Sequence, residues 1–492
     1  MAGSSGLPRL RLESVACFER DFKLRLPFRF GVITLTEGTQ AVVRATVAFE
    51  DGRAATGVAA ESLGAKWFDK NPAFSDAQNL DQLRQALSLA IGLYSSRGWS
   101  TPFGLYAATY DDQIRRGAEL GLVPLVASYG PALLDRAILD ALGRVMGLSF
   151  ADIITRNVAG IEAVPELTSD LAGYDLPRFL GGLRPGRIAV RHTVGLLDPI
   201  VATDQSPEDR VNDGLPETLE EVVRTYGTRY YKLKVAGDVK GDLDRLARIA
   251  TVLDRDAGAY RATLDGNEQY DDVEGIAELW RRMRETPALA RLVAATLFIE
   301  QPIKRAQALA TPVDALSRLK PLIIDESDGE LSSFPAAVRL GYSGVSSKSC
   351  KGLYKSILNA ARVAKLNAEA GAARYFMSAE DLTTLAGVSV QQDLALVSLL
   401  GLTHVERNGH HFIDGMSFAP EREQAAFARA HADLYRRSAG PARLLIDNGQ
   451  LSIGSLACPG FAVAADMDFD AMRPMPAAPA ERLTPAFPEK IA

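Results

Sequence analysis

The sequence predicts an α/β protein built on a (β/α) barrel with a smaller α+β region before it. Length is the first observation, because 492 residues are too many for one simple core and two domains are expected. The second is a change of pattern near residue 187, where strands followed by helices give way to regular strand–helix alternation. The third is that charged residues recur where successive strands should end, as at the mouth of a parallel barrel.

The composition excludes several classes of protein. Hydrophobic residues make up 47% and charged residues 24%, an ordinary globular balance, and the net charge of -6 disfavours nucleic acid as a partner. Cys17, Cys350 and Cys458 lie far apart without a Cys-x-x-Cys pair, which disfavours structural zinc and fits a reduced, cytoplasmic setting. We see no signal-peptide pattern and no apolar run of about 18 residues, so no membrane span is predicted.

The N-terminal region, residues 1–158, reads as an α+β domain. Alternating or β-branched runs predict strands at 9–25, 39–49 and 54–61, with an Asp51-Gly52 turn before the last. Helical periodicity follows at 79–95, 105–120 and 132–145. The stretch 159–186 is rich in Gly and Pro with little periodicity, so we interpret it as a linker or insertion.

Residues 187–440 read as the barrel. The predicted strands are 188–195, 230–235, 261–265, 295–300, 322–325, 344–348, 374–378 and 402–406. Amphipathic stretches lie between them at 216–226, 242–255, 273–284, 312–319, 331–340, 354–370 and 390–400. Eight strands, most of them followed by a helix, favour a closed barrel over an open sheet. The open sheet would usually carry a glycine-rich nucleotide turn after its first strand, and none is present.

The C-terminal segment, residues 441–492, turns back to strand signals over 443–463. The run 444–453 reads as a hairpin around an Asn448-Gly449 turn. We expect this segment to join the N-terminal domain or to cover the barrel.

Three carboxylates end three consecutive predicted strands. Asp265, Glu300 and Asp325 are 35 and 25 residues apart, and each interval can hold one crossover helix. Hard carboxylate oxygens suit Mg²⁺, with Mn²⁺ as an alternative, and the absence of a His or Cys partner argues against zinc. Glu326, one position beyond Asp325, remains an alternative third ligand.

Three lysines complete this set. Lys232 and Lys234 share one face of the second barrel strand, and burying that face against helices would be costly, so we place both side chains at the mouth. Lys348 ends the sixth strand, which lies opposite the second in a ring of eight. A lysine whose pKa is lowered by a neighbouring cation can remove a proton α to a carboxylate that chelates the metal.

These motifs, in this order, resemble the enolase superfamily, in its mandelate racemase-like and muconate lactonizing enzyme branch with dipeptide epimerases and o-succinylbenzoate synthases. The matching motifs are Lys232-Leu233-Lys234, Asp265-Gly266-Asn267, Glu300-Gln301-Pro302, Asp325-Glu326-Ser327, the strand ending at Lys348, and the segments 26–31, 140–144 and 458–461. The run Ser349-Cys350-Lys351-Gly352 departs from the Gly-Gly turn that this branch often carries after the sixth strand.

The resemblance implies a modified TIM barrel, (β/α)7β-like, with an α+β capping domain formed by the N-terminal region and the C-terminal tail. It implies that Lys234 and Lys348 are the acid/base pair and that Lys232 polarises the substrate carboxylate and supports Lys234. It implies Mg²⁺ ligation by Asp265, Glu300 and Asp325. The predicted substrate-binding residues are Phe28, Phe30 and Trp67 in the capping loops and Asn267, Glu380 and Asp381 at strand ends, the last two as acids for a positively charged substrate group.

The predicted function is Mg²⁺-dependent removal of a proton α to a carboxylate. The resulting metal-stabilised enediolate would lead to racemisation, epimerisation or cycloisomerisation. A dehydratase or o-succinylbenzoate synthase-like lyase is the alternative reaction, and a non-catalytic ligand-binding relative is the alternative class. We expect a small-molecule carboxylate as partner and a homo-oligomer.

A few other residues carry weaker expectations. Lys351 is expected to face solvent, His192 to be a core histidine, and Cys350 to be a small packing residue. The pair His410-His411 is balanced between a surface turn and a substrate contact.

Overall fold

The computed structural model describes residues 6–31, 33–183, 186–437 and 440–486. Eight parallel strands form a closed barrel, in which each strand pairs with the next and the last returns to the first. They are β4 (Arg187–Val194), β5 (Tyr230–Lys234), β6 (Arg261–Asp265), β7 (Thr296–Glu300), β8 (Leu322–Ile324), β9 (Gly344–Ser347), β10 (Phe376–Ala379) and β11 (His404–Arg407). The predicted barrel is therefore confirmed, with strand ends shifted by one or two residues.

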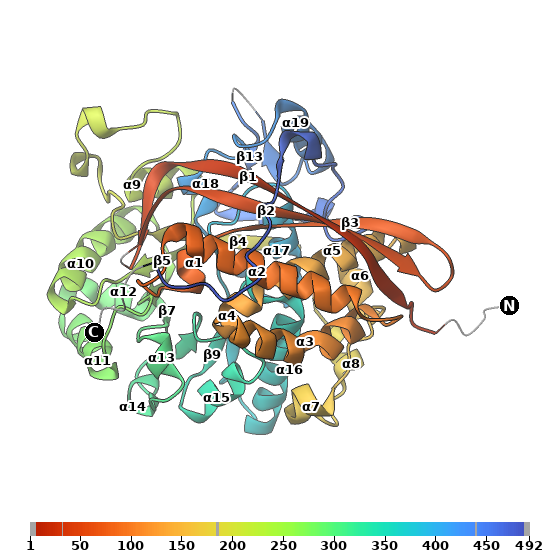
Figure 1. The fold of residues 1–492 in the computed structure, drawn as a ribbon. Coiled ribbons are helices and arrows are strands. Elements are labelled where there is room, and N and C mark those ends of the chain that lie inside the picture. The colour runs from red at the N-terminus through yellow and green to blue at the C-terminus, as the bar shows by residue number, and fades with distance from the viewer. Residues whose placement is uncertain (1–5, 32, 184–185, 438–439, 487–492) are drawn as a thin grey trace.

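Helices surround the barrel, and each predicted amphipathic stretch contains one (Figure 1). They are α9 (Leu219–Tyr226), α10 (Val239–Asp256), α11 (Val273–Glu285), α12 (Ala290–Ala295), α13 (Arg305–Ala308), α14 (Asp314–Ser317), α15 (Ser333–Arg339), α16 (Leu353–Ala370), α17 (Val388–Leu399), α18 (Gly409–Phe412) and α19 (Glu421–Ala430). In α9, for example, Val222 and Val223 are buried, and Glu221 completes a capping box with Thr218.

An antiparallel sheet forms the core of the cap. It joins β1 (Leu10–Phe30), β2 (Ile33–Phe49), β3 (Ala54–Ser62) and the C-terminal strand β15 (Arg473–Pro474). The hairpin of β1 and β2 extends across the barrel (Figure 1). Strand β1 continues beyond residue 25, where we expected it to end, because Leu26, Phe28 and Phe30 keep the period-two pattern of buried side chains.

The cap helices are α1 (Ala65–Phe68), α2 (Asp76–Ser95), α3 (Pro102–Glu119), α4 (Pro124–Ala127), α5 (Tyr129–Met146) and α6 (Phe150–Thr155). The three long helices begin three residues before the predicted starts. Ser75 caps α2 through Gln78 and Thr101 caps α3 ahead of Pro102, so polar capping residues extend both helices beyond the apolar periodicity. Helix α5 packs on β3 at Gly57, where a Cβ atom would lie 2.1 Å from the Ala137 carbonyl oxygen.

The segment between cap and barrel is more regular than predicted. It contains the short helices α7 (Pro165–Thr168) and α8 (Leu176–Leu180). Asp170 pairs with Arg362 of α16 at 2.7 Å, which holds the segment against the barrel helices. The domain boundaries at 158, 186 and 440 remain predictions.

The predicted C-terminal hairpin forms only at its turn. Asn448 and Gly449 both have positive φ, and backbone hydrogen bonds between Asp447 and Gln450 close the turn. However, β13 (Arg443–Leu444) pairs with β12 (Tyr435–Arg436), whereas β14 (Gln450–Ser452) adds antiparallel to barrel strand β4. The tail then returns to the cap, where Phe461 stacks on Phe150 at 3.7 Å and β15 pairs with β1. It therefore both covers the barrel and joins the cap.

Among the described helices, none combines the length and the apolar character that crossing a membrane requires.

A buried acid in the cap gives a pH-dependent prediction. Asp135 accepts a hydrogen bond from the Tyr94 hydroxyl at 2.8 Å, and its second oxygen has no partner. Burial raises the pKa of Asp135 well above its usual value. The folded protein thus retains a proton that the unfolded chain loses above about pH 3.9, so stability should fall as pH rises above that value, by at most about 1.4 kcal/mol per pH unit. Asp135→Asn should remove this loss.

We therefore expect Asp135→Asn to match the wild type near pH 4 and to exceed its melting temperature increasingly toward pH 7. Scanning calorimetry across this range measures the difference. Asp111→Asn, an exposed acid in α3, is the matched control and should show a flat difference. A variant less stable than wild type at pH 7 would show that the Asp135 carboxylate is charged and stabilising.

Candidate active site

A cavity of about 890 Å³ lies between the cap hairpin and the barrel mouth. Its outer wall comes from the cap and combines the buried aromatic side chains of Phe28, Phe30 and Trp67 with polar and charged ones, such as Lys23, Glu37 and Lys66. Its floor comes from the ends of the barrel strands and is polar. The floor residues are Lys234, Asn267, Lys348, Asp381, Thr383, Glu406 and Asn408.

Strand register explains why three of the predicted site residues lie together. Lys234, Asp265 and Glu300 are direct register partners on β5, β6 and β7. In a parallel sheet such partners point to the same face, so the three side chains lie side by side. Lys234 lines the cavity, whereas Asp265 and Glu300 are fully buried and are not among the described lining residues. The Lys234 Nζ atom lies 2.6 Å from Asp265 Oδ2.

Lys232 lies one layer deeper and is fully buried. Its ammonium group contacts four carboxylates at 2.8–2.9 Å, from Asp265, Glu300, Glu380 and Glu406. Lys232 is not among the described residues that line the cavity. That Lys232 polarises the substrate carboxylate stays a prediction; in this structure its ammonium group holds two of the predicted metal ligands.

Several residues of this deeper layer were not predicted. Arg191 on β4 pairs with Glu380, and the Thr193 hydroxyl donates to Glu406 at 2.7 Å. Glu406 on β11 also reaches the cavity floor. The only available signal was that these charged residues interrupt otherwise apolar barrel strands, since fully buried charges need partners.

Asp325 follows β8 and is surrounded by donors. Lys348 Nζ lies 2.7 Å from Asp325 Oδ2, and the Ser346 hydroxyl donates to Oδ1. Lys351 Nζ lies 3.4 Å from Asp325 Oδ1 and 3.0 Å from Asp328 Oδ2. The expectation that Lys351 faces solvent is wrong: a 3₁₀ turn at Ser349–Lys351 folds the chain back after β9 and buries the side chain.

Glu326 competes with Asp325 for the role of third ligand. Its Oε1 atom accepts a hydrogen bond from Asn267 Nδ2 at 3.1 Å, and its Oε2 atom has no partner. Lys70 of the cap lies 3.4 Å from the same Oε1 atom. Asp325 and Glu326 are both fully or nearly fully buried, so both stay candidates. Lys70 could not be found from the sequence, because it approaches from a segment more than 250 residues away.

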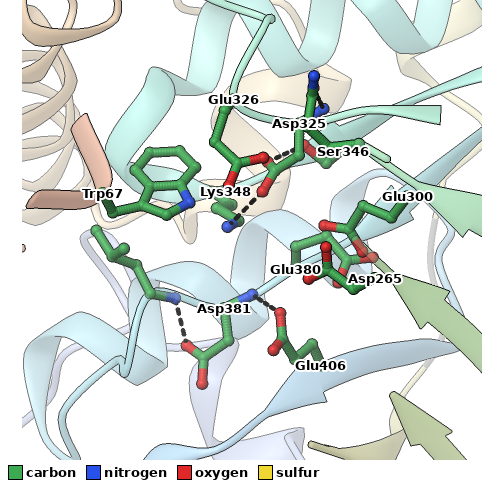
Figure 2. Close-up of polar contacts among 12 residues, drawn as sticks. Trp67, Asp265, Glu300, Asp325, Glu326, Ser346, Lys348, Glu380, Asp381 and Glu406 are labelled. Carbon is green, nitrogen blue, oxygen red and sulfur yellow. Dashed lines mark hydrogen bonds and ion pairs between the residues drawn. The ribbon is translucent and has the colours of Figure 1, made fainter. Parts of the chain in front are cut away.

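The two predicted acid/base lysines both reach the cavity. Lys234 comes from the second barrel strand and Lys348 follows the sixth, so they approach from opposite sides. Lys348 lies between Trp67 and Asp325, with Nζ 4.1 Å from the indole ring centre (Figure 2). The cation–π contact and the ion pair fix the position of this ammonium group.

The charges in the site are unevenly distributed. Burial tends to raise the pKa of Asp265, but Lys232 and Lys234 outweigh it and the pKa is lowered. For Asp325, Lys348 and Lys351 likewise overcome burial and lower the pKa. The pKa of Glu300 is instead raised well above its usual value, because burial is reinforced by the negative charges of Asp265 and Glu380. Around Glu300, the negative charge of the carboxylates therefore exceeds the positive charge of the neighbouring lysines.

The donor set has the chemistry of a Mg²⁺ site without being preassembled. Among the described residues, no group of three His, Cys, Asp or Glu side chains is arranged to hold a metal ion. Even so, three buried carboxylates supply hard oxygen ligands: Asp265, Glu300, whose Oε2 atom pairs with Lys232 at 2.8 Å, and Asp325, whose Oδ2 atom pairs with Lys348 at 2.7 Å. These carboxylates and the raised pKa of Glu300 fit a divalent cation, whose binding would require the carboxylates to turn away from the lysines.

The predicted substrate-binding residues divide into two groups. Phe28, Phe30, Trp67, Asn267 and Asp381 line the cavity. Glu380 is not among the described lining residues, because Arg191 and Lys232 bind it from below. The Asp381 carboxylate accepts hydrogen bonds from the backbone N–H groups of Leu382, Thr384 and Asn408 and so organises the loop after β10; its contact with a charged substrate group stays a prediction.

Comparisons with known proteins support the fold. No family model and no curated protein matches the sequence. Solved structures do match. An enolase from Streptomyces coelicolor superposes with a TM-score of 0.59 at 17% identity, covering 93% of this chain and 95% of that one. A muconate lactonizing enzyme from Pseudomonas fluorescens, complexed with muconolactone, has a TM-score of 0.58 at 17% identity. The match covers 94% of this chain and 98% of that one.

A dipeptide epimerase from Methylococcus capsulatus, complexed with Mg and the dipeptide L-Arg-D-Lys, gives a TM-score of 0.54 at 18% identity, with 90% and 99% covered. These structures belong to the enolase superfamily, and the chain has the fold of that superfamily: a parallel eight-stranded barrel with an antiparallel capping sheet. An enolase, a muconate lactonizing enzyme and a dipeptide epimerase are thus among the enzymes that share its architecture.

Proposed function

We propose that this protein is a Mg²⁺-dependent isomerase that removes the proton α to a carboxylate and returns it, with racemisation or epimerisation as the favoured outcome. The observation that carries the proposal is the placement of Lys234 and Lys348 on opposite sides of one cavity, each paired with a carboxylate of the predicted metal set. Two opposed bases allow a proton to leave one face of the α-carbon and another to be added to the other face.

In this mechanism the neutral form of one lysine accepts the α-proton at Nζ, and the protonated form of the other donates at the opposite face. Asp265 holds Lys234 in place, and Asp325 and Trp67 do the same for Lys348. Lys232 keeps Asp265 and Glu300 together from below. The cap side chains Phe28, Phe30 and Trp67 exclude water from the cavity. Bound Mg²⁺, held by Asp265, Glu300 and Asp325 or Glu326, would supply charge stabilisation for the enediolate.

The cavity also indicates the size and the hydrogen-bonding groups of the substrate. Its volume of about 890 Å³ is near the upper end for small-molecule sites, so it suits an acid with a large apolar substituent against the phenylalanines. Two buried acceptors that line it, Asn267 Oδ1 and Asn408 Oδ1, have no hydrogen-bond partner among the described residues, and neither does the donor Trp67 Nε1. Because buried polar groups are normally satisfied, we expect the substrate to present hydrogen-bond donors and an acceptor to them.

The test is α-proton exchange in D₂O, followed by NMR with a library of apolar α-substituted carboxylic acids. We expect Mg²⁺-dependent exchange of at least one acid, loss of exchange on chelation, and recovery on adding Mg²⁺ or Mn²⁺. Glu300→Gln removes one ligand charge and should weaken Mg²⁺ binding by at least tenfold in calorimetry.

The matched control is Glu285→Gln, an exposed acid at the end of α11. Acids that bind without any exchange, with or without Mg²⁺, would favour a ligand-binding protein over an enzyme. Unchanged exchange and metal affinity in Glu300→Gln would contradict the ligand assignment.

A further inference from the structure

A second cavity, of about 240 Å³, lies beside the C-terminal segment and is not part of the proposed active site. Its wall combines polar side chains with an apolar side. The polar ones are Thr225, Tyr226, Thr384, His410, Arg436 and Arg443, and the apolar ones are Leu215, Pro216, Leu444, Leu445 and Ile446. The sequence had drawn attention to His410 without assigning it a role.

Of the two arginines, Arg443 is paired with a carboxylate and the exposed Arg436 is not. Arg436 on β12 and Arg443 on β13 are direct register partners in an antiparallel pair, where like charges repel. Arg443 is neutralised by Asp414, at 2.6 Å from its Nε atom. Arg436 has no hydrogen bond or ion pair from its side chain among the described residues. The cavity mouth therefore has one positive charge without a counter-charge.

The wall of this cavity also holds one buried, unsatisfied polar atom. His410 Nδ1 has no hydrogen-bond partner among the described residues. Its Nε2 atom lies 3.4 Å from His192 Nδ1, which orients the ring. The half-buried Tyr226 also lines the cavity, and burial raises its pKa to about 12, so its hydroxyl remains a donor. An arginine and a tyrosine hydroxyl in one cavity wall are donors that suit an oxyanion.

The second cavity is separated from the first by a thin wall of two segments. Thr383 and Asn408 line the large cavity, and their neighbours Thr384 and Gly409 line the small one. The segments touch so closely that a Cβ atom on Gly409 would lie 2.6 Å from the Thr384 carbonyl oxygen. Thr383 has a φ of 49°, a strained conformation for a β-branched residue.

We propose that this second cavity is an accessory binding site for a small organic carboxylate. The carboxylate would bind Arg436 and the Tyr226 hydroxyl, and a short apolar part would lie against Leu215, Leu444 and Ile446. These apolar side chains favour an organic acid over inorganic phosphate, which gains nothing from them. With less than a third of the volume of the main cavity, the site is too small for the substrate proposed there.

Calorimetric titration of the full-length protein with propionate, benzoate and phosphate tests the proposal. Arg436→Gln should weaken binding of the preferred carboxylate by at least tenfold, and Tyr226→Phe should weaken it by a smaller factor. Arg437→Gln is the matched control, since Arg437 is the next residue, pairs with Glu421 and is not among the described lining residues. Carboxylates that also bind the main cavity do so equally in both arginine variants, so the difference isolates the second cavity.

Identical affinities in Arg436→Gln and Arg437→Gln would overturn the site. Phosphate binding as tightly as either carboxylate would overturn the choice of an organic acid. Far-UV circular dichroism of each variant confirms that a loss of binding is not a loss of fold, and Tyr226→Phe provides an independent check from the cavity wall.

Discussion

Lys348→Met is expected to lower the rate of α-proton exchange by about 10²–10⁴-fold for the enantiomer that this lysine deprotonates, the usual contribution of a general acid or base. The Lys348 ammonium lines the cavity, pairs with Asp325 and packs over Trp67, so it has a defined position from which to act on a bound acid. Methionine keeps most of the side-chain volume and removes the proton-carrying group. The fold should survive, because Lys351 and Ser346 still contact Asp325.

The measurement is stereospecific. In D₂O, Lys348→Met should retain exchange for one enantiomer of the substrate, and Lys234→Met should retain it for the other, while racemisation is lost in both. Lys365→Met, in an exposed ion pair on α16, is the control and should behave as wild type. Full racemisation in Lys348→Met together with its loss in Lys234→Met would rule out the two-base arrangement.

Lys232→Met is expected to destabilise the protein by about 3–5 kcal/mol, the cost of breaking a buried ion pair by removing one partner. The Lys232 ammonium is the common partner of Asp265, Glu300, Glu380 and Glu406, all fully or nearly fully buried. Without it, only part of their charge is still compensated, by Lys234 at Asp265 and by Arg191 at Glu380.

Chemical denaturation with and without Mg²⁺ measures this loss. Lys240→Met, an exposed lysine at the start of α10, should change stability by less than about 0.5 kcal/mol. Added Mg²⁺ should recover part of the stability of Lys232→Met, because a cation near Asp265 and Glu300 replaces part of the missing charge. A variant as stable as wild type would show that these carboxylates are protonated and that Lys232 does not hold them.

The candidate site could be predicted from sequence to the extent that it depends on strand order. Lys234, Asp265 and Glu300 end successive parallel strands, and the ends of such strands meet at one mouth whatever the loops do. The depth of each side chain could not be predicted in this way. Lys232 and Lys234 share a face, yet two residues along the strand separate a buried layer from the cavity floor.

The positions of residues that follow a strand were harder still to predict. Lys351 belongs to a turn whose direction depends on the packing of Ser349 against Glu61 and Asp393, which come from the cap and from α17. Glu380 was expected to meet the substrate, but Arg191, nearly 190 residues earlier, holds it in the deeper layer. In each case the residue that fixes the side chain's position is distant in the chain, so the local sequence pattern cannot predict it.

By itself, the sequence determined the barrel, the β-rich start of the cap and the order of the charged strand ends, because period-two and helical periodicity are local and register in a parallel barrel brings strand ends together. Only the tertiary structure decided which of those charges reach the cavity, that Lys70 approaches from the cap, and that the tail strands separate, with β12 and β13 lining a second cavity. Those features depend on contacts between distant segments, where burial and charge pairing act on side chains that no local pattern connects.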